Sequence, residues 1–286
     1  MFKRLIITVI LVGILVNIAY RLDHLALSQE REEELMYFPS GYGLRVLSLG
    51  FRSLLADIVW LQFIQYYGEH RLTDRKYTHM YHILDILTTL NPRFIRAYLL
   101  GSLLLTHDAQ HPDQAKKLIR KGMYHNPDTW VLPFYYGFIH FVFLRDFTTA
   151  QVYFKLAARK PYAPDLPQRW AAFITYKKIG DLESALELWL DLYNSSQNEV
   201  EREIARLYIM DIKSRLDIEY LNDKVEVFKN KFDRDPMDLE ELVQYGILDS
   251  VPREPHGENY KIEKGKAVST YKRDLLLWQK AREGNK

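Results

Sequence analysis

The sequence predicts an all-α protein, a solenoid of helical hairpins with a transmembrane helix near the N-terminus and a small C-terminal β-hairpin element. Three observations lead to this fold class. Apolar residues recur every 35 positions at helical spacing, a 16-residue apolar run follows two basic residues near the start, and residues 246–270 combine prolines and glycines with short alternating stretches. With 286 residues, of which 48% are apolar, the chain is able to bury a sizeable core.

Composition argues against several function classes. The chain has 39 basic and 37 acidic residues and no Lys/Arg stripe, so we expect no nucleic-acid partner. It has no cysteine, which removes disulfides, thiolate metal sites and cysteine nucleophiles.

Residues 1–22 are predicted to form a transmembrane anchor that contacts the bilayer over residues 2–22. Lys3 and Arg4 precede the apolar run from Leu5 to Tyr20, which would span roughly 24 Å as a helix and is extended by snorkelling side chains. The two basic residues favour a cytoplasmic N-terminus, which places the bulk of the chain on the far side of the membrane.

Two other interpretations of this segment stay open. One is a signal peptide that is cleaved at Ala26-Leu27-Ser28, although this sequence lies far from the apolar run. The other is a buried helix. Residues 23–56 follow as a linker and a leading helix, which opens with the turn-forming stretch "SGYG" and then becomes apolar.

Residues 57–197 contain four copies of the 35-residue pattern. The first packing positions are Met80, Ala115, Ala150 and Ala185. Four residues further on stand Leu84, Ile119, Phe154 and Trp189. Pro92, Pro127 and Pro161 close the first three helices. A generic helical bundle is the alternative, but it does not require four registers in step.

This pattern resembles the second helix of a tetratricopeptide repeat (TPR), which has the form A-x3-F-x2-A followed by P. The stretch "ITYKKIGDLESALELW" is similar to the turn and second helix that are most typical of the family. The resemblance implies antiparallel helix pairs, each of which buries its apolar stripe against the next pair. Met80 stands where the family has alanine, and Gly122 occupies the third packing position.

The more charged residues 198–236 are predicted to form a capping helix pair, "EVEREIARLYIMDIKSRL" and "IEYLNDKVEVFKNKFDRDP". A polar terminal pair is what the open end of a solenoid requires.

The TPR resemblance also implies a partner groove, lined by the first helix of each pair. Carried over residue by residue, its inward positions include Gln65, Leu100, Leu104, Tyr135, Ile139 and Trp170. The family's Lys, Arg and Asn residues that hold a terminal carboxylate are missing here, so a carboxylate clamp is not expected. The stretch "WVLPFYYGFIHFVFL", residues 130–144, is either a fully buried helix or an aromatic groove for an apolar protein segment.

Residues 237–286 are predicted to hold a turn, a strand pair and a terminal helix. The turn residues are Pro252, Pro255, Gly257 and Tyr260. Gly257 is free to take positive φ, and "ENYKI" is expected to pair with "KAVST". Such a hairpin is marginal alone and has to pack on a helix.

This segment resembles the C-terminal end of major pseudopilins of type II secretion systems. The matching residues are Leu242, Gly246, Leu248, Pro252, Pro255, Gly257, Tyr260 and Ser269. Glu254 replaces the family's aspartate, and the calcium ligands and the N-terminal cleavage signal of pseudopilins cannot be matched. The resemblance implies a link to envelope assembly in bacteria, without a filament role.

We expect no enzyme, no cofactor and no metal site. The pair His107/His111 lacks the glutamate of a zinc-protease helix and is followed by Pro112, and the pair His79/His82 lies on a helix that already carries the repeat pattern. No P-loop, G-x-S-x-G or G-x-G-x-x-G motif is present. The sequence therefore predicts a scaffold that is anchored in the bacterial cytoplasmic membrane and binds protein partners, for instance secretion or pilus-assembly components, on its outer side. The alternative is an accessory structural subunit of a stable membrane complex.

Overall fold

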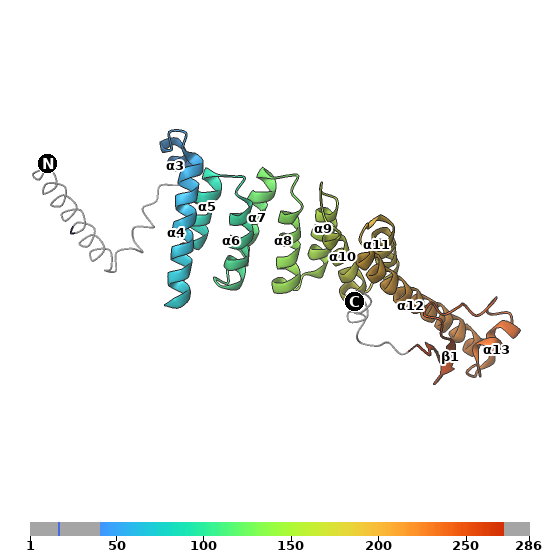
Figure 1. The fold of residues 1–286 in the computed structure, drawn as a ribbon. Helices are drawn as coiled ribbons and strands as arrows, with labels where there is room; N and C mark the ends of the chain where they lie inside the picture. Colours follow the sequence, from blue (N-terminus) through green and yellow to red (C-terminus); the bar gives the residue numbers. More distant parts are fainter. Residues whose placement is uncertain (1–16, 18–40, 272–286) are drawn as a thin grey trace, which may run out of the picture. The chain divides into compact units, whose positions relative to one another are not determined.

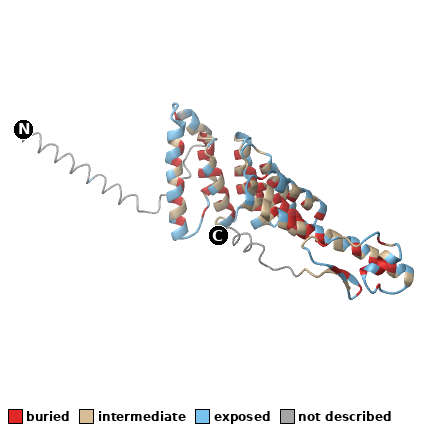
Figure 2. Ribbon diagram, turned by 45° about the vertical axis from the view of Figure 1, so that its right-hand side comes forward, coloured by how far each residue is buried: buried red, intermediate tan, exposed pale blue. Residues whose placement is uncertain are grey.

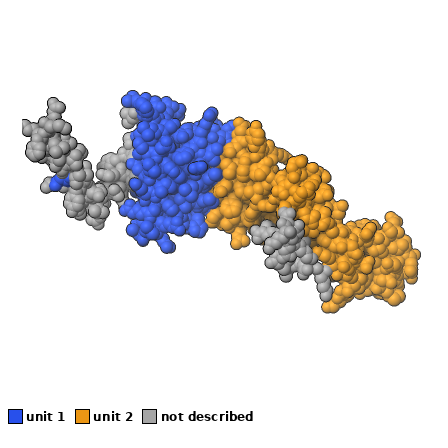
Figure 3. Space-filling view, viewed as in Figure 1, with its two compact units in different colours: residues 1–127 blue, residues 128–286 orange. Residues whose placement is uncertain are grey.

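The computed structural model describes residue 17 and residues 41–271, and the chain divides into two compact units, residues 1–127 and residues 128–286 (Figure 3). The described residues are mostly helical and include one two-stranded antiparallel sheet, which confirms the all-α class with a small C-terminal β-hairpin. The predicted anchor and the predicted terminal helix lie outside these ranges, apart from residue 17. Within the described ranges no helix combines the length and the apolar character that a membrane span requires.

The described part of unit 1 contains two helical hairpins preceded by a short helix (Figure 1). Its helices are α3 (Gly41–Leu47), α4 (Arg52–Leu72), α5 (Met80–Leu90), α6 (Ile95–His107) and α7 (Pro112–His125). Helix α4 packs on α5, α6 packs on α7, and α3 lies against α5. The predicted leading helix and the first helix of the first repeat are thus one continuous helix, α4.

Glycines at the helix crossings let the helices of unit 1 approach closely. A Cβ atom on Gly122 of α7 would lie only 2.8 Å from Cγ of Tyr98, and one on Gly101 of α6 would lie 2.6 Å from Cδ1 of Leu84. Tyr98 and Leu84 are fully buried. Figure 2 shows such buried residues on the inner faces of the paired helices, as expected for amphipathic helices that share a core.

Unit 2 continues with hairpins and ends in a small mixed module. Its elements are α8 (Val131–Ile139), η1 (His140–Leu144), α9 (Phe147–Ala158), α10 (Asp165–Ile174), η2 (Thr175–Ile179), α11 (Leu182–Ser195), α12 (Glu199–Phe232), α13 (Leu239–Gln244), β1 (Tyr260–Glu263) and β2 (Lys266–Ser269). Helix α9 packs on α8 and α10, and α11 packs on α10 and α12.

Capping side chains fix where several of these helices begin. Asp146 accepts a hydrogen bond from the Thr149 N–H at 3.1 Å, and Asp181 accepts one from the Ser184 N–H at 3.0 Å. Each bond satisfies a backbone donor that the first turn of a helix leaves unpaired. These aspartates therefore set the starts of α9 and α11.

The predicted capping helix pair over residues 198–236 is wrong, because α12 is one continuous helix of 34 residues. No glycine or proline interrupts residues 199–232, and Asp217 alone does not break a helix. Its two halves serve different cores. The first half packs Ala205, Tyr208, Ile209 and Ile212 around Trp189 of α11, and the second half packs Leu221, Val225 and Phe228 against α13 and the hairpin.

The C-terminal hairpin forms as predicted and packs on the second half of α12. Strands β1 and β2 pair antiparallel, with Tyr260 opposite Ser269, and the turn between them places Lys264 and Gly265 at φ of 52° and 72°. Two consecutive left-handed residues are typical of a tight hairpin turn whose twist matches that of the strands. Gly257 has φ of 88°, so the predicted positive φ is confirmed.

Candidate protein-binding surface

The residues predicted to pack repeat against repeat are all buried. At the first packing position, Met80, Ala115, Ala150 and Ala185 have no exposed surface. The same holds at the second position for Leu84, Ile119, Phe154 and Trp189. The 35-residue spacing therefore corresponds to equivalent interior positions on successive second helices.

The turns between the paired helices repeat the same spacing in their backbone. Arg75, Gln110, Arg145 and Gly180 have positive φ, at 57°, 56°, 55° and 85°. Each of these residues precedes the second helix of its pair and stands 35 positions from the next. Sequence reasoning missed this feature because only Gly180 is a glycine. Counting back from it in steps of 35 would have located the other three.

In unit 2 the first helix of each pair ends in a π-helical turn. These turns are η1 and η2, and they lead directly into Arg145 and Gly180. π-Helical turns are rare and redirect the side chains that they carry. The turn η1 carries Phe141, which faces Trp170 of the next pair at a ring-centroid distance of 5.1 Å.

Trp170 of α10 lies at the centre of an aromatic cluster in unit 2. Its ring centroid is 5.7 Å from that of Phe154 and 6.3 Å from that of Phe138. Phe154 is fully buried, whereas Trp170, Tyr135 and Phe138 are half-buried and so keep an open face. The predicted groove would be excluded if Trp170 and Tyr135 were fully buried, and they are not.

The other predicted groove positions differ in their exposure. Ile139 of α8 is fully buried and offers no open surface, because it lies on the side of the helix that faces the core. In unit 1, Gln65 of α4 is exposed, Leu100 of α6 is 37% exposed, and Leu104 of the same helix is half-buried. The groove positions thus form separate half-open surfaces on the first helices of each unit.

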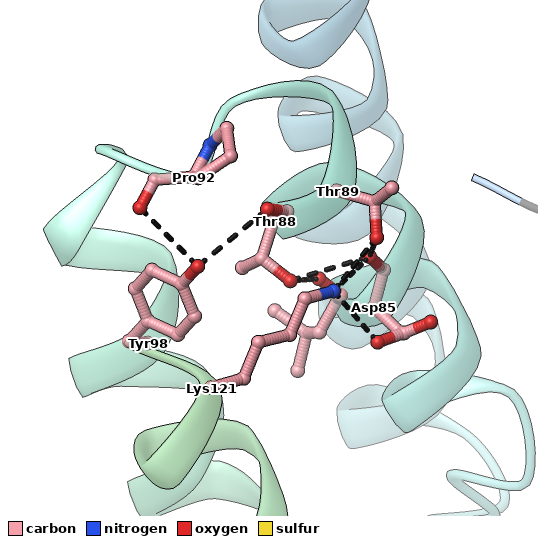
Figure 4. A network of polar contacts seen from close by, with 7 residues as sticks. Asp85, Thr88, Thr89, Pro92, Tyr98 and Lys121 are labelled. Carbon is pink, nitrogen blue, oxygen red and sulfur yellow. Dashed lines mark hydrogen bonds and ion pairs between the residues drawn. The ribbon is translucent and has the colours of Figure 1, made fainter. Parts of the chain in front are cut away.

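A polar network in unit 1 joins α7 to α5 (Figure 4). Nζ of Lys121 donates to the Asp85 carbonyl oxygen at 2.9 Å, to Oδ1 of Asp85 at 2.8 Å and to Oγ1 of Thr89 at 2.7 Å. Charge-assisted hydrogen bonds of this kind are stronger than neutral ones. The lysine therefore joins the second helices of two consecutive pairs.

Tyr98 of α6 belongs to the same network and also contacts the loop between α5 and α6. Its hydroxyl donates to the Pro92 carbonyl oxygen at 3.3 Å, and burial raises the pKa of the phenol to about 12. Nδ2 of Asn126 donates to the same carbonyl oxygen at 2.8 Å. Two side chains, from α6 and from the end of α7, thus hold the loop that carries Pro92.

The tail turn is organised by one residue that the sequence analysis mentioned only as a departure. Glu254 is buried, and its Oε2 accepts a hydrogen bond from the His256 N–H at 2.6 Å. Its Oε1 accepts one from Oγ of Ser269 at 3.3 Å. A glutamate is long enough to span from the proline turn to the end of β2. Pro252 and Pro255 lie half-buried on either side of it.

Tyr260 connects the tail to α12. Its hydroxyl donates to Oδ2 of Asp217 at 2.8 Å. Burial raises the pKa of Tyr260 well above its ordinary value, and the hydrogen bond to Asp217 adds to this effect. The phenol is therefore a permanent donor to α12. This contact gives the hydroxyl of the aromatic residue at the start of β1 a structural role.

The described histidines of unit 1 do not form a ligand set. Nδ1 of His107 pairs with Oδ1 of Asp108 at 2.7 Å, and His111 stands at the start of α7. Across residue 17 and residues 41–271, no group of three or more His, Asp or Glu side chains is placed to hold a metal ion.

Comparison of the chain with protein-family models, curated proteins and solved structures found no match.

Proposed function

We propose that the protein is a membrane-anchored TPR-like scaffold that binds protein partners on the outer side of a bacterial cytoplasmic membrane, in the assembly of an envelope complex. The observation that carries the proposal is the 35-residue recurrence of buried packing residues and left-handed turn residues, from Arg75 to Gly180. Repeats of this kind present a series of equivalent first helices to a partner.

The chemistry of the half-open positions indicates the kind of partner. Trp170, Tyr135 and Leu100 offer aromatic and aliphatic surface, and no basic clamp lies among the predicted groove residues. Large aromatic side chains with one face open are typical anchors of protein interfaces. The partner would be an apolar or amphipathic helix, and not a peptide held by its terminal carboxylate.

The likeness of the tail to pseudopilin ends supports envelope assembly as the setting. The hairpin and the positive φ of Gly257 agree with the geometry that the likeness implies. The anchor over residues 2–22 is part of the proposal and rests on the apolar run between Leu5 and Tyr20.

Site-specific photo-cross-linking in native membranes tests the proposal. A photoreactive residue at Leu100, on the first helix α6, is compared with one at Leu156, on the second helix α9. The two leucines are matched in exposure, at 37% and 38%. We expect a defined adduct from position 100 and none from position 156. Equal labelling from both positions would contradict a first-helix binding surface.

The identity of the adduct separates the scaffold from the accessory-subunit alternative. A secretion or pilus-assembly component that is captured from only part of the protein population supports the scaffold. A respiratory or transport subunit that is captured in every copy and survives detergent extraction supports a permanent structural subunit.

A further inference from the structure

The turn between α3 and α4 exposes a group of large apolar side chains. Val46, Leu49, Phe51 and Leu54 are 68%, 87%, 68% and 57% exposed. They stand within nine consecutive residues, 46–54. Single exposed apolar residues are ordinary, but a group of large ones at one turn indicates an interaction surface.

This turn is a built structure and not a frayed end. Oγ of Ser48 donates to the Arg45 carbonyl oxygen at 2.8 Å, and the Phe51 N–H donates to the Ser48 carbonyl oxygen at 2.8 Å. Leu49 has φ of 47°, a left-handed conformation that is unusual for a leucine. The backbone thus holds the Leu49 side chain away from the unit.

The apolar surface continues along α4. Leu54, Ile58 and Leu61 are all exposed and stand at i, i+4 and i+7, which places them on one face of the helix. Gln65 follows on the same face and ends the apolar stretch. The first three turns of α4 therefore extend the exposed surface of the turn.

Positive charge flanks the turn itself. Arg45 and Arg52 are exposed on either side of it, and the nearest acidic residue among the described ones is Asp57, which is exposed further along α4 between Leu54 and Ile58. Gly41 of α3 packs on Thr89 near the end of α5, so the loop that follows α5 lies at the same end of unit 1 (Figure 1). That loop and the start of α6 add two exposed arginines, Arg93 and Arg96.

We propose that the α3–α4 turn docks on an anionic lipid bilayer, with Leu49 and Phe51 in the interface and the arginines at the headgroup phosphates. Apolar residues flanked by cationic ones are what an interfacial membrane contact requires. Pairing with a second copy fits less well, because a two-fold contact would place the arginines of both copies against each other. The inference rests on the proposed membrane location only for access to the bilayer.

The absence of cysteine makes a direct depth measurement possible. Leu49→Cys in the full chain is labelled with the fluorophore NBD and reconstituted in vesicles of phosphatidylcholine, with or without phosphatidylglycerol and brominated lipid. Tyr162→Cys is the matched control, because Tyr162 is 99% exposed and also left-handed, with φ of 56°. Flotation of the vesicles after an alkaline carbonate wash, which removes peripherally bound protein, reports separately whether the chain is anchored.

We expect the label at position 49 to shift to the blue and to be quenched by brominated lipid in the phosphatidylglycerol vesicles, and the label at 162 to do neither. The double variant Arg45→Glu, Arg52→Glu should reduce the quenching at 49 to the level at 162. Circular dichroism checks that each variant keeps its helix content, which exposed substitutions should not alter.

Four results would overturn the proposal. A chain that floats without quenching at position 49 overturns the docking and leaves the anchor intact. A chain that neither floats nor shows quenching overturns both. A blue shift without lipid quenching shows that protein, and not lipid, covers the turn. Quenching that does not depend on lipid charge or on the arginine substitutions shows that headgroup contacts are not involved. Quenching without an anchored population supports the docking and contradicts the anchor.

Discussion

Left-handed turn residues are a residue-scale signature of the repeat in this chain. Arg75, Gln110 and Arg145 adopt at a cost the conformation that Gly180 adopts freely. The structure keeps these residues in place because the helices on both sides of each turn are packed. The residues that depart from the glycine preference therefore show that packing, and not local propensity, sets the turn.

Gly180→Ala should lower the free energy of unfolding by about 1 kcal/mol, because alanine is strained at positive φ. Alanine also makes the unfolded chain less flexible, but the stabilisation that results offsets only part of the strain. Gly68→Ala is the control, because Gly68 lies in α4 at ordinary helical φ and, like Gly180, has no atom within 4 Å of an added Cβ. It should stabilise α4 by roughly 0.5–1 kcal/mol. Urea unfolding followed by circular dichroism measures the stability of both variants. A change of the same sign in the two variants would contradict this prediction.

Gly137 tests the close packing of two helices, whereas Gly180 tests backbone conformation. A Cβ atom at this position in α8 would lie 3.1 Å from the carbonyl oxygen of Ala150 and 3.2 Å from the ring of Phe154. The backbone oxygen cannot move aside as a flexible side chain can. Gly137→Ala should therefore destabilise unit 2 by about 1–3 kcal/mol, the usual cost of overpacking. Urea unfolding that shows no loss of stability for Gly137→Ala would show that the helices separate easily.

At the scale of elements, α12 shows both what the sequence predicts and what it does not. The apolar residues of its two halves predict helix correctly, but the predicted pair was divided at one residue, Asp217. Asp217 has no local reason to end a helix, and its Oδ2 accepts a hydrogen bond from the hydroxyl of Tyr260 in the hairpin. That contact joins residues 43 positions apart, so no local pattern contains it.

Dependence on contacts between distant residues also explains why the exposure of the candidate surface was not predicted. Helical spacing predicted the buried packing residues, because burial of a periodic stripe follows from local geometry. The exposure of single groove positions depends on the neighbouring pair, so Ile139 is buried while Trp170 is half-open. The π-helical turns η1 and η2 have no signature in composition, and they alter the register in which the end of each first helix meets its neighbour.

Asn222 is the element-scale test of how α12 holds the hairpin. Its Oδ1 accepts from the Ala267 N–H at 2.9 Å, and its Nδ2 donates to the Ala267 carbonyl oxygen at 3.3 Å. Asn222→Ala leaves both backbone groups of Ala267 without this partner, which should cost about 1–3 kcal/mol. Hydrogen exchange at the Ala267 amide should accelerate accordingly. Asn194→Ala, at an exposed position on α11, is the control and should leave that amide unchanged.

At the scale of the whole molecule, hydrogen-bonded carboxylates recur along the chain. Neighbouring donors lower the pKa of six of these carboxyl groups, with a hydrogen bond as the largest cause in each: Asp74, Asp113, Asp146, Asp181, Glu203 and Glu241. A carboxyl group whose pKa is lower in the folded state stabilises the fold above its unfolded pKa. This stabilisation is lost as the pH falls through the folded pKa. The chain should therefore lose stability in acid and not near neutrality.

The caps of α9 and α11 separate this effect into parts. Hydrogen bonds from Thr149 and Ser184 lower the pKa of Asp146 and Asp181 below their ordinary value of 3.8. Asparagine caps a helix about as well as aspartate but does not titrate. The double variant Asp146→Asn, Asp181→Asn should thus be somewhat less stable at pH 7 and should lose less stability than the wild type between pH 5 and pH 3.

Urea unfolding at a series of pH values measures this difference, and the single variants assign it. Asp146 also lies 3.0 Å from Nδ1 of His140, so its replacement removes a second contact. Asp181 has no histidine partner among the described residues, and Asp181→Asn alone should reproduce the acid part of the effect. If its stability falls as steeply as that of the wild type below pH 5, the cap of α11 does not contribute to acid sensitivity. The remaining carboxylates would then account for the loss.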